Sequence, residues 1–268
     1  MLRASVGDAE LAYEIRGRGE PVLLIHGSHV ADAFLPLATE SALSEYRLIR
    51  YHRRGLGAST PHDGAFGIPR QAADAERLLA HLEVDRAHVV GHSYGAVTAL
   101  QLASQSEVVH SLALLEPPLL GVPSGELLEE ALAPAIECYQ RGDPVGAVDA
   151  FMCVVCGADW REHAARAVPG GAEQAERDAS TFFEIEFPAL GEWNLDADAR
   201  ERVSAPILYI IGGESGRFAE EGRDLAESWF PDVESRVVAG ANHLLQVQKP
   251  SPIAEKIVAF LRRHPLPA

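Results

Sequence analysis

The 268-residue sequence contains few cysteines: Cys138, Cys153 and Cys156. A small, odd number argues against a framework of disulfide bonds. Cys153 and Cys156 have CxxC spacing, but they lie in an apolar stretch between helix-like segments. A zinc site would need a further pair of Cys or His ligands at matching spacing, and none is evident. We therefore expect buried structural thiols and no metal site.

Basic residues and long apolar runs are also scarce. The chain has 23 basic and 39 acidic residues, a formal net charge of −16. Such a surface repels phosphate groups, so neither nucleic acid nor an anionic membrane is expected as a partner. No run approaches the about 18 apolar residues of a transmembrane helix, and the first residues contain no long apolar segment typical of a signal peptide. These absences predict a soluble, cytoplasmic protein.

What the sequence does contain is an alternation of strand-like and helix-like segments. Several strand-like runs are continuously apolar, as in strands buried on both faces of a parallel sheet. The alternation predicts an α/β fold with a doubly wound, mostly parallel sheet. Strands are expected at 9–16, 22–25, 46–51, 86–90, 110–115, 206–211 and 233–238, and helices at 68–82, 96–103, 218–229 and 250–263.

The pattern changes between residues 119 and 200, where short buried-strand runs are missing. Helix-like segments replace them, at 124–140, 144–156, 159–167 and 172–185. We therefore predict a core formed by residues 1–118 and 201–268. Residues 119–200 are expected to form a helical insertion after the sixth core strand.

The sequence Gly91-His92-Ser93-Tyr94-Gly95 lies between an expected strand and an expected helix. A serine with glycine two positions before and two after it, on such a turn, is typical of a nucleophile elbow. The turn is sharp, so side chains at the two glycine positions would clash. The hydroxyl of Ser93 would then stand at the N-terminus of a helix, where developing negative charge is favoured.

A serine nucleophile needs a base, and histidine suits this role because its pKa lies near neutrality. Polar residues directly follow many of the expected strands, and the carboxyl ends of parallel strands meet at one edge of a sheet. His243 stands out among them because it lies in the loop 240–243 between the last strand and the last helix. The residues expected at this edge are His26, His52, Ser93, Glu116, Glu214 and His243.

Together, these motifs resemble the α/β-hydrolase family. The resemblance rests on His26-Gly27 after an early strand, the turn at 55–59, the elbow at 91–95 and the histidine loop at 240–243. It implies that residues 119–200 form a cap, or lid, and that no cofactor is needed. One departure is His52, where relatives often carry an aspartate.

The acidic partner of His243 has two candidates. Many relatives place an aspartate a few residues past the seventh strand, where this chain offers only Glu214. Other relatives, similar to zearalenone lactonase, take the acid from the end of the sixth strand, where Glu116 lies. We favour Glu116 because two prolines follow it and restrict its backbone, while glycine and serine flank Glu214.

By the same resemblance, the backbone N–H groups of Tyr94 and Ser28 would hold an oxyanion. His29 is expected near the pocket mouth. Apolar residues of the insertion would line the pocket, namely Phe151, Met152, Trp160, Phe182, Phe183, Phe187 and Trp193.

The resemblance implies a serine hydrolase that cleaves an ester or lactone of a small, largely apolar molecule through Ser93, His243 and Glu116. Hydrolysis of a C–C bond, or a lyase reaction such as hydroxynitrile cleavage, would use the same three residues. A non-catalytic ligand-binding module is a further alternative, but such proteins often lose a member of the triad, and this chain retains both Ser93 and His243.

Overall fold

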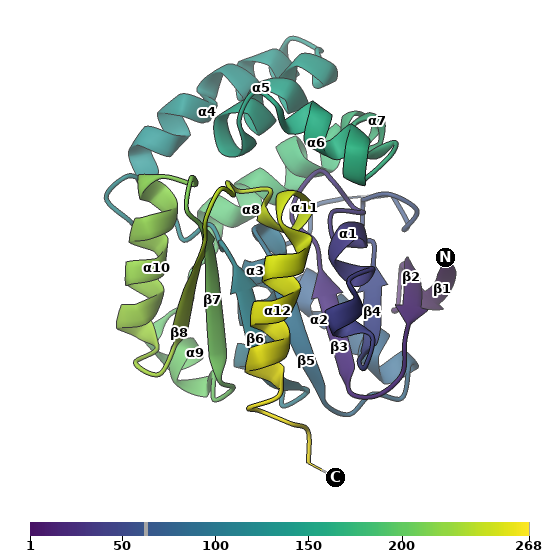
Figure 1. Cartoon of the computed structure of the whole chain (residues 1–268). Coiled ribbons are helices and arrows are strands. Elements are labelled where there is room, and N and C mark those ends of the chain that lie inside the picture. Colours follow the sequence, from purple (N-terminus) through teal and green to yellow (C-terminus); the bar gives the residue numbers. More distant parts are fainter. Residues whose placement is uncertain (62–63, 268) are drawn as a thin grey trace.

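The computed structural model describes residues 1–61 and 64–267, which fold into a sheet with helices on both faces (Figure 1). Its strand order is β1-β2-β4-β3-β5-β6-β7-β8. β1 and β4 each pair with β2 in antiparallel orientation, and the other neighbours are parallel, so the predicted sheet is confirmed. The strands are β1 (Leu2–Ser5), β2 (Glu10–Arg16), β3 (Pro21–Ile25), β4 (Arg47–Tyr51), β5 (Ala87–His92), β6 (Val109–Leu115), β7 (Ile207–Gly212) and β8 (Glu234–Val238).

The central strands bury both of their faces, which explains their continuously apolar sequences. In β3, Leu23 and Ile25 belong to the apolar core on one face of the sheet, while Val22 and Leu24 belong to the core on the other. This alternation follows from the two-residue period of a strand. β1 was not predicted from the sequence, because its exposed edge position leaves a single buried residue, Ala4.

Two layers of helices cover these faces (Figure 1). Apolar residues of the first set pack in one core and those of the second set in the other. The first set is α2 (Ile68–His81), α3 (Tyr94–Gln105), α9 (Ala197–Arg202) and α10 (Arg217–Trp229). The second set is α1 (Leu35–Ala38), the short 3-10 helix η1 (Ser41–Leu43), α11 (Leu245–Gln248) and α12 (Pro250–Leu261).

The remaining helices lie between β6 and β7 in the sequence, and α4 to α7 stand above the sheet at the carboxyl ends of its parallel strands (Figure 1). α9 spans the predicted end of the insertion at residue 200 and packs beside α3. The division of the chain into a core and a cap stays a prediction. The helices are α4 (Gly125–Gln140), α5 (Pro144–Cys156), α6 (Trp160–Ala167), α7 (Gly171–Arg177), the π-helix η2 (Thr181–Glu186) and α8 (Phe187–Glu192).

One predicted helix in this region is interrupted at a single residue, Asp178. The sequence predicts a single helix over 172–185, but α7 ends at Arg177 and η2 begins at Thr181. The Asp178 carboxylate accepts a hydrogen bond from the Gly57 amide at 2.6 Å, and the hydroxyl of Thr181, the first residue of η2, donates to the Gly55 carbonyl at 2.6 Å. These two bonds attach the interrupted segment to a loop of the core.

No helix in the described part of the chain has the length and apolar character needed to cross a membrane.

Candidate active site

The turn between β5 and α3 holds Ser93 in a strained conformation. Ser93 has φ 52° and ψ −125°, a region that residues other than glycine rarely adopt. A Cβ atom at Gly95 would lie 2.1 Å from the Ile25 carbonyl oxygen, and one at Gly91 would lie 2.6 Å from the Ala96 Cα. Both distances are far shorter than van der Waals contact, so the close packing of this turn requires glycine at both positions.

Ser93, His243 and Glu116 form one chain of hydrogen bonds. The Ser93 hydroxyl lies 2.9 Å from Nε2 of His243, and Nδ1 of His243 lies 2.6 Å from Oε2 of Glu116. Because an ionised carboxylate only accepts, the neutral ring carries its proton on Nδ1 and offers Nε2 as acceptor to the serine. This arrangement fits a nucleophile, a general base and an orienting acid.

Glu116 is held by more than the two prolines that follow it. Its φ is 48°, its side chain is 2% exposed, and its amide donates to the Ile210 carbonyl of β7 at 3.2 Å. The carboxylate oxygen that faces away from His243 accepts from the Gly212 amide at 2.6 Å and from the Ser215 hydroxyl at 2.5 Å. Both oxygens are therefore engaged, which fixes the carboxylate relative to the histidine.

Glu214, the other candidate acid, does not reach His243. Its amide donates to the Ala241 carbonyl at 2.9 Å, and its exposed side chain borders a separate polar hollow beside His163 and Lys249. The structure therefore brings Glu116, and not Glu214, together with the histidine.

The two residues expected to supply oxyanion donors, Ser28 and Tyr94, line the same pocket as Ser93 and His243. Tyr94 is the first residue of α3, so its amide has no acceptor within the helix. The Tyr94 side chain is buried, and burial raises the pKa of its hydroxyl.

Two residues that sequence reasoning missed, His92 and Gln246, support the histidine loop. His92 Nε2 donates to the His243 carbonyl at 2.8 Å, and its Nδ1 accepts from the Gln246 side-chain amide at 3.0 Å. Burial, followed by the nearby His243, holds the pKa of His92 well below its usual value, so the ring is neutral. The one available signal was the position of His92 inside the elbow motif, next to Ser93.

His52 does not join the chain of hydrogen bonds formed by Ser93, His243 and Glu116. Its Nδ1 accepts from the Ala58 amide at 2.9 Å, and its Nε2 donates to Asp32 at 3.0 Å. The bond from His52 holds the pKa of Asp32 well below its usual range. A Cβ atom at Gly57 would lie 2.3 Å from His52 Nδ1, so this ring packs directly under the 55–59 turn. His52 therefore shapes the turn.

His29 does not lie at the pocket mouth, and that expectation was wrong. Its side chain is 1% exposed, and its ring packs among those of Phe151, Phe182 and Phe183 at centroid distances of 4.9, 4.3 and 5.9 Å. Burial lowers the pKa of His29 to about 3. The ring is therefore a neutral part of the packing beneath the insertion.

The pocket above Ser93 has a volume of about 400 Å³ and an apolar lining, contributed by both the core and the insertion. Of the expected wall residues, Phe151, Phe182 and Phe187 line it, and Met152 borders an adjoining hollow. Trp160 is instead buried and donates to Asp149, Phe183 stacks on Tyr139, and Trp193 donates to Gln101.

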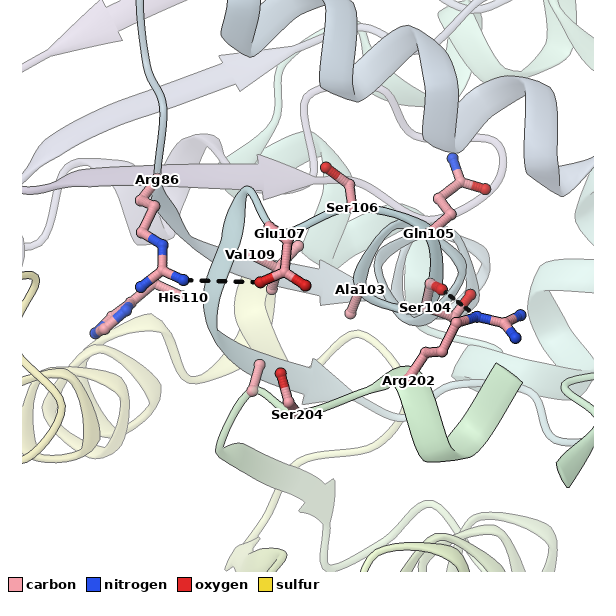
Figure 2. A pocket seen from close by; sticks show the side chains of 11 residues that line it. Arg86, Ala103, Ser104, Gln105, Ser106, Glu107, Val109, His110, Arg202 and Ser204 are labelled. Atoms are coloured by element: carbon pink, nitrogen blue, oxygen red, sulfur yellow. Dashed lines mark hydrogen bonds and ion pairs between the residues drawn. The ribbon is translucent and has the colours of Figure 1, made fainter. Parts of the chain in front are cut away.

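A second pocket, of about 570 Å³, lies at the opposite end of the sheet, beside the first residues of β5 and β6 (Figure 2). Its histidine, His110, is bonded to the carbonyl oxygens of His264 and Pro265 at 3.2 and 2.9 Å. Arg202 donates to the Ser104 carbonyl at 2.9 Å, as Figure 2 shows. This pocket therefore offers no hydrogen-bonded pair of nucleophile and base among its described residues.

The three cysteines are not joined by disulfide bonds. Cys138, Cys153 and Cys156 are free thiols, and burial raises the pKa of Cys153 and Cys156. Cys156 is buried, whereas Cys153 is only partly so. Within residues 1–61 and 64–267, no group of His, Cys, Asp and Glu side chains could hold a metal ion.

A mostly parallel sheet with a strand–serine–helix turn at its carboxyl edge defines the class of α/β hydrolases. The model of the alpha/beta hydrolase family matches residues 22–256, and the chain belongs to this family. The predicted fold and the predicted class of enzyme, a hydrolase, are therefore confirmed.

Two relatives of known sequence are similar to this chain over nearly its whole length. The chain is 24% identical to the esterase YbfF of Escherichia coli strain K12, over 90% of this chain and 92% of the relative. It is 31% identical to a putative carbamate hydrolase, RutD, of Variovorax paradoxus strain S110, over 96% of this chain and 98% of the relative.

The solved structures are below 25% identity, and their likeness is one of fold. A thermophilic esterase from Thermogutta terrifontis has a TM-score of 0.81 and 23% identity, over 99% of this chain and all of the other. The enol-lactonase from Burkholderia xenovorans LB400 has a TM-score of 0.79 and 22% identity, over 97% of this chain and all of the other.

Proposed function

We propose that the protein is a serine hydrolase that cleaves an ester or lactone of a small, uncharged and largely apolar molecule. The observation that carries this proposal is the chain from Ser93 through His243 to Glu116, with hydrogen bonds of 2.9 and 2.6 Å. Relatives named esterase and a structural neighbour named enol-lactonase support the same class of reaction.

In the proposed mechanism, Nε2 of His243 takes the proton of Ser93 while the serine oxygen attacks the substrate carbonyl carbon. Glu116 stabilises the resulting imidazolium through its bond to Nδ1. The amides of Ser28 and Tyr94 hold the oxyanion, and each such donor is worth roughly 3 kcal/mol in the transition state. His243 then protonates the leaving alcohol, and a water that it activates releases the acid from the acyl-enzyme.

The pocket lining supports an apolar, uncharged substrate. Its acidic lining residues are Glu116 and Glu129, and no lysine or arginine occurs among the described lining residues. An apolar wall favours alkyl or aromatic groups. We propose that residues 119–200 act as the cap that supplies this wall, since Phe151, Leu132 and Phe187 come from there.

Labelling with a fluorophosphonate, followed by mass spectrometry of the digested protein, tests the nucleophile. The expected result is one adduct on Ser93 in the unmodified protein and none in Ser93→Ala. If the folded protein carries no adduct on Ser93 after labelling, the assignment of Ser93 as the nucleophile is wrong. Rates on matched p-nitrophenyl esters and lactones then show which bond is cleaved faster.

A further inference from the structure

A buried arginine, Arg53, holds the turn that precedes Ser28. It follows β4 and is 1% exposed. Its Nε donates to the His26 carbonyl at 2.9 Å, and its Nη2 donates to the Gly27 carbonyl at 2.8 Å. One planar guanidinium thus fixes two consecutive peptide groups. The second of them, between Gly27 and Ser28, contains the N–H of the proposed oxyanion donor Ser28.

The same guanidinium touches the second proposed donor residue. The Arg53 Cζ lies 4.8 Å from the centre of the Tyr94 ring, a cation–π distance. Arg53 therefore contacts both segments whose amides would face the oxyanion, although its own side chain does not line the pocket.

The partner of Arg53 comes from the insertion. Glu186, the last residue of η2, is fully buried and accepts a hydrogen bond from Arg53 Nη1. Gln71 of α2 completes the cluster, since it accepts from Arg53 at 2.5 Å. Within the described residues, Arg53–Glu186 is the one ion pair that joins residues 119–200 to the rest of the chain.

Stability alone does not account for this pair. Burying two charges costs as much as their attraction returns in many proteins, and an apolar pair of similar size is often equally stable. Moreover, the second carboxylate oxygen of Glu186 has no hydrogen-bond partner in the described part of the chain. Glu186 also ends a π-helix, an irregular element that occurs frequently at functional sites.

We propose that Arg53 is a positioning residue that, through its ion pair with Glu186, couples the seating of η2 on the core to the geometry of the oxyanion donors Ser28 and Tyr94. The inference rests on the proposed function for the role of those donors. When η2 is seated, Glu186 fixes the guanidinium, and the guanidinium fixes the His26 and Gly27 carbonyls. When η2 moves away, the turn loses this support.

Steady-state kinetics of Glu186→Gln on a p-nitrophenyl ester tests the coupling. Because the donors would be misplaced rather than lost, kcat should fall by about tenfold to a hundredfold, with KM changed by less than about threefold. A purely structural role would lower the stability of Glu186→Gln but leave kcat per folded molecule unchanged, and that result would overturn the proposal.

Asp74→Asn is the matched control. Asp74 forms a buried ion pair with the neighbouring Arg54, through two hydrogen bonds of 2.8 and 2.9 Å. That pair contacts neither η2 nor the turn before Ser28, so its loss should lower stability with kcat retained. An equal fall of kcat in both variants would contradict a specific role of Arg53.

The double variant Arg53→Met with Glu186→Leu separates the two effects further. Removing both charges should restore stability relative to Glu186→Gln, since no buried charge is left unpaired. The kcat should stay low, because the His26 carbonyl then loses its bond from the guanidinium, and the Gly27 carbonyl keeps only its bond from His26 Nδ1, at 2.7 Å. Recovery of kcat together with stability would show that the arginine does not position the turn.

Hydrogen exchange of the amides in residues 27–30 provides a readout that does not require turnover. Exchange there should be faster in Glu186→Gln than in the unmodified protein, and unchanged in Asp74→Asn. If the unmodified protein cleaves no ester, the proposed function fails while this measurement still tests the coupling. Unchanged exchange in Glu186→Gln would overturn the coupling even in an active enzyme.

Discussion

At the scale of a single residue, Glu116 determines which nitrogen of His243 carries the proton. In Glu116→Gln, the side-chain amide can donate to Nδ1 and so favour the tautomer that cannot accept from Ser93. We expect kcat to fall by about 10⁴-fold, as a wrong tautomer does in serine proteases. Glu214→Gln, on an exposed side chain, should leave kcat unchanged. Steady-state measurement of kcat for both variants on the same ester tests this prediction. A near-normal kcat in Glu116→Gln would exclude Glu116 as the acid.

A second residue, His29, makes the stability depend on pH. Its pKa is about 3 in the folded protein and near 6.5 in the unfolded chain. Between these values the unfolded chain binds a proton that the folded protein does not, so stability is fully present above pH 6.5 and is lost as the pH falls toward 3. The slope approaches about 1.4 kcal/mol per pH unit.

His29→Phe should remove this dependence. The difference in the free energy of unfolding between pH 7 and pH 5 is expected to be about 2 kcal/mol smaller than in the unmodified protein. Urea unfolding at both pH values measures it, with His81→Phe, a change at an exposed histidine, as the control. An unchanged difference in His29→Phe would show that His29 titrates normally in the fold.

At the scale of elements, the junction of β5 and α3 depends on glycine. Gly95→Ala places a Cβ atom 2.1 Å from the Ile25 carbonyl and 2.4 Å from that of His26, so β3 and α3 must move apart. We expect a loss of about 3 kcal/mol in stability, as for a severely overpacked core, together with loss of fluorophosphonate labelling. Gly121→Ala, where nothing lies within 4 Å of the added atom, should be neutral in thermal unfolding and labelling. Equal stability of the two variants would contradict this account of the turn.

The elements that the sequence predicted well are those with local signals. β3 and β7 are apolar runs of one strand's length, and the Ser93 turn is marked by two glycines within five residues. The break between α7 and η2 has no such local signal. The side chains beside it, Asp178 and Thr181, bond to a loop more than 120 residues away in the sequence.

The prediction of the site was also limited by contacts between residues that lie far apart in the sequence. Glu116 and Glu214 both follow strands, and only the position of the His243 loop relative to β6 and β7 decides between them. The support of His243 by His92, and that of Arg53 by Glu186, join residues 151 and 133 positions apart. Such pairs follow from the tertiary fold and not from any spacing along the chain.

At the scale of the whole molecule, a net charge of −16 surrounds a pocket whose lining includes Glu129 and no described lysine or arginine. An anionic substrate is therefore repelled on approach and finds no cation inside. p-Nitrophenyl hexanoate and the mono-p-nitrophenyl ester of adipic acid have the same six-carbon acyl chain and differ by one terminal carboxylate. At low salt we expect kcat/KM to be at least about tenfold lower for the anion, which corresponds to about 1.4 kcal/mol.

Two changes should reduce the difference in kcat/KM between the neutral and the anionic ester. Raising the salt concentration screens the surface charge, so kcat/KM should rise for the anionic ester and stay constant for the neutral one. Glu129→Lys, which places a cation at the exposed edge of the pocket, should favour the anionic ester, whereas Glu130→Lys, on the next exposed residue of α4 but outside the lining, should act only through net charge. Equal rates for the two esters at low salt would mean that neither the surface field nor the lining selects against anions.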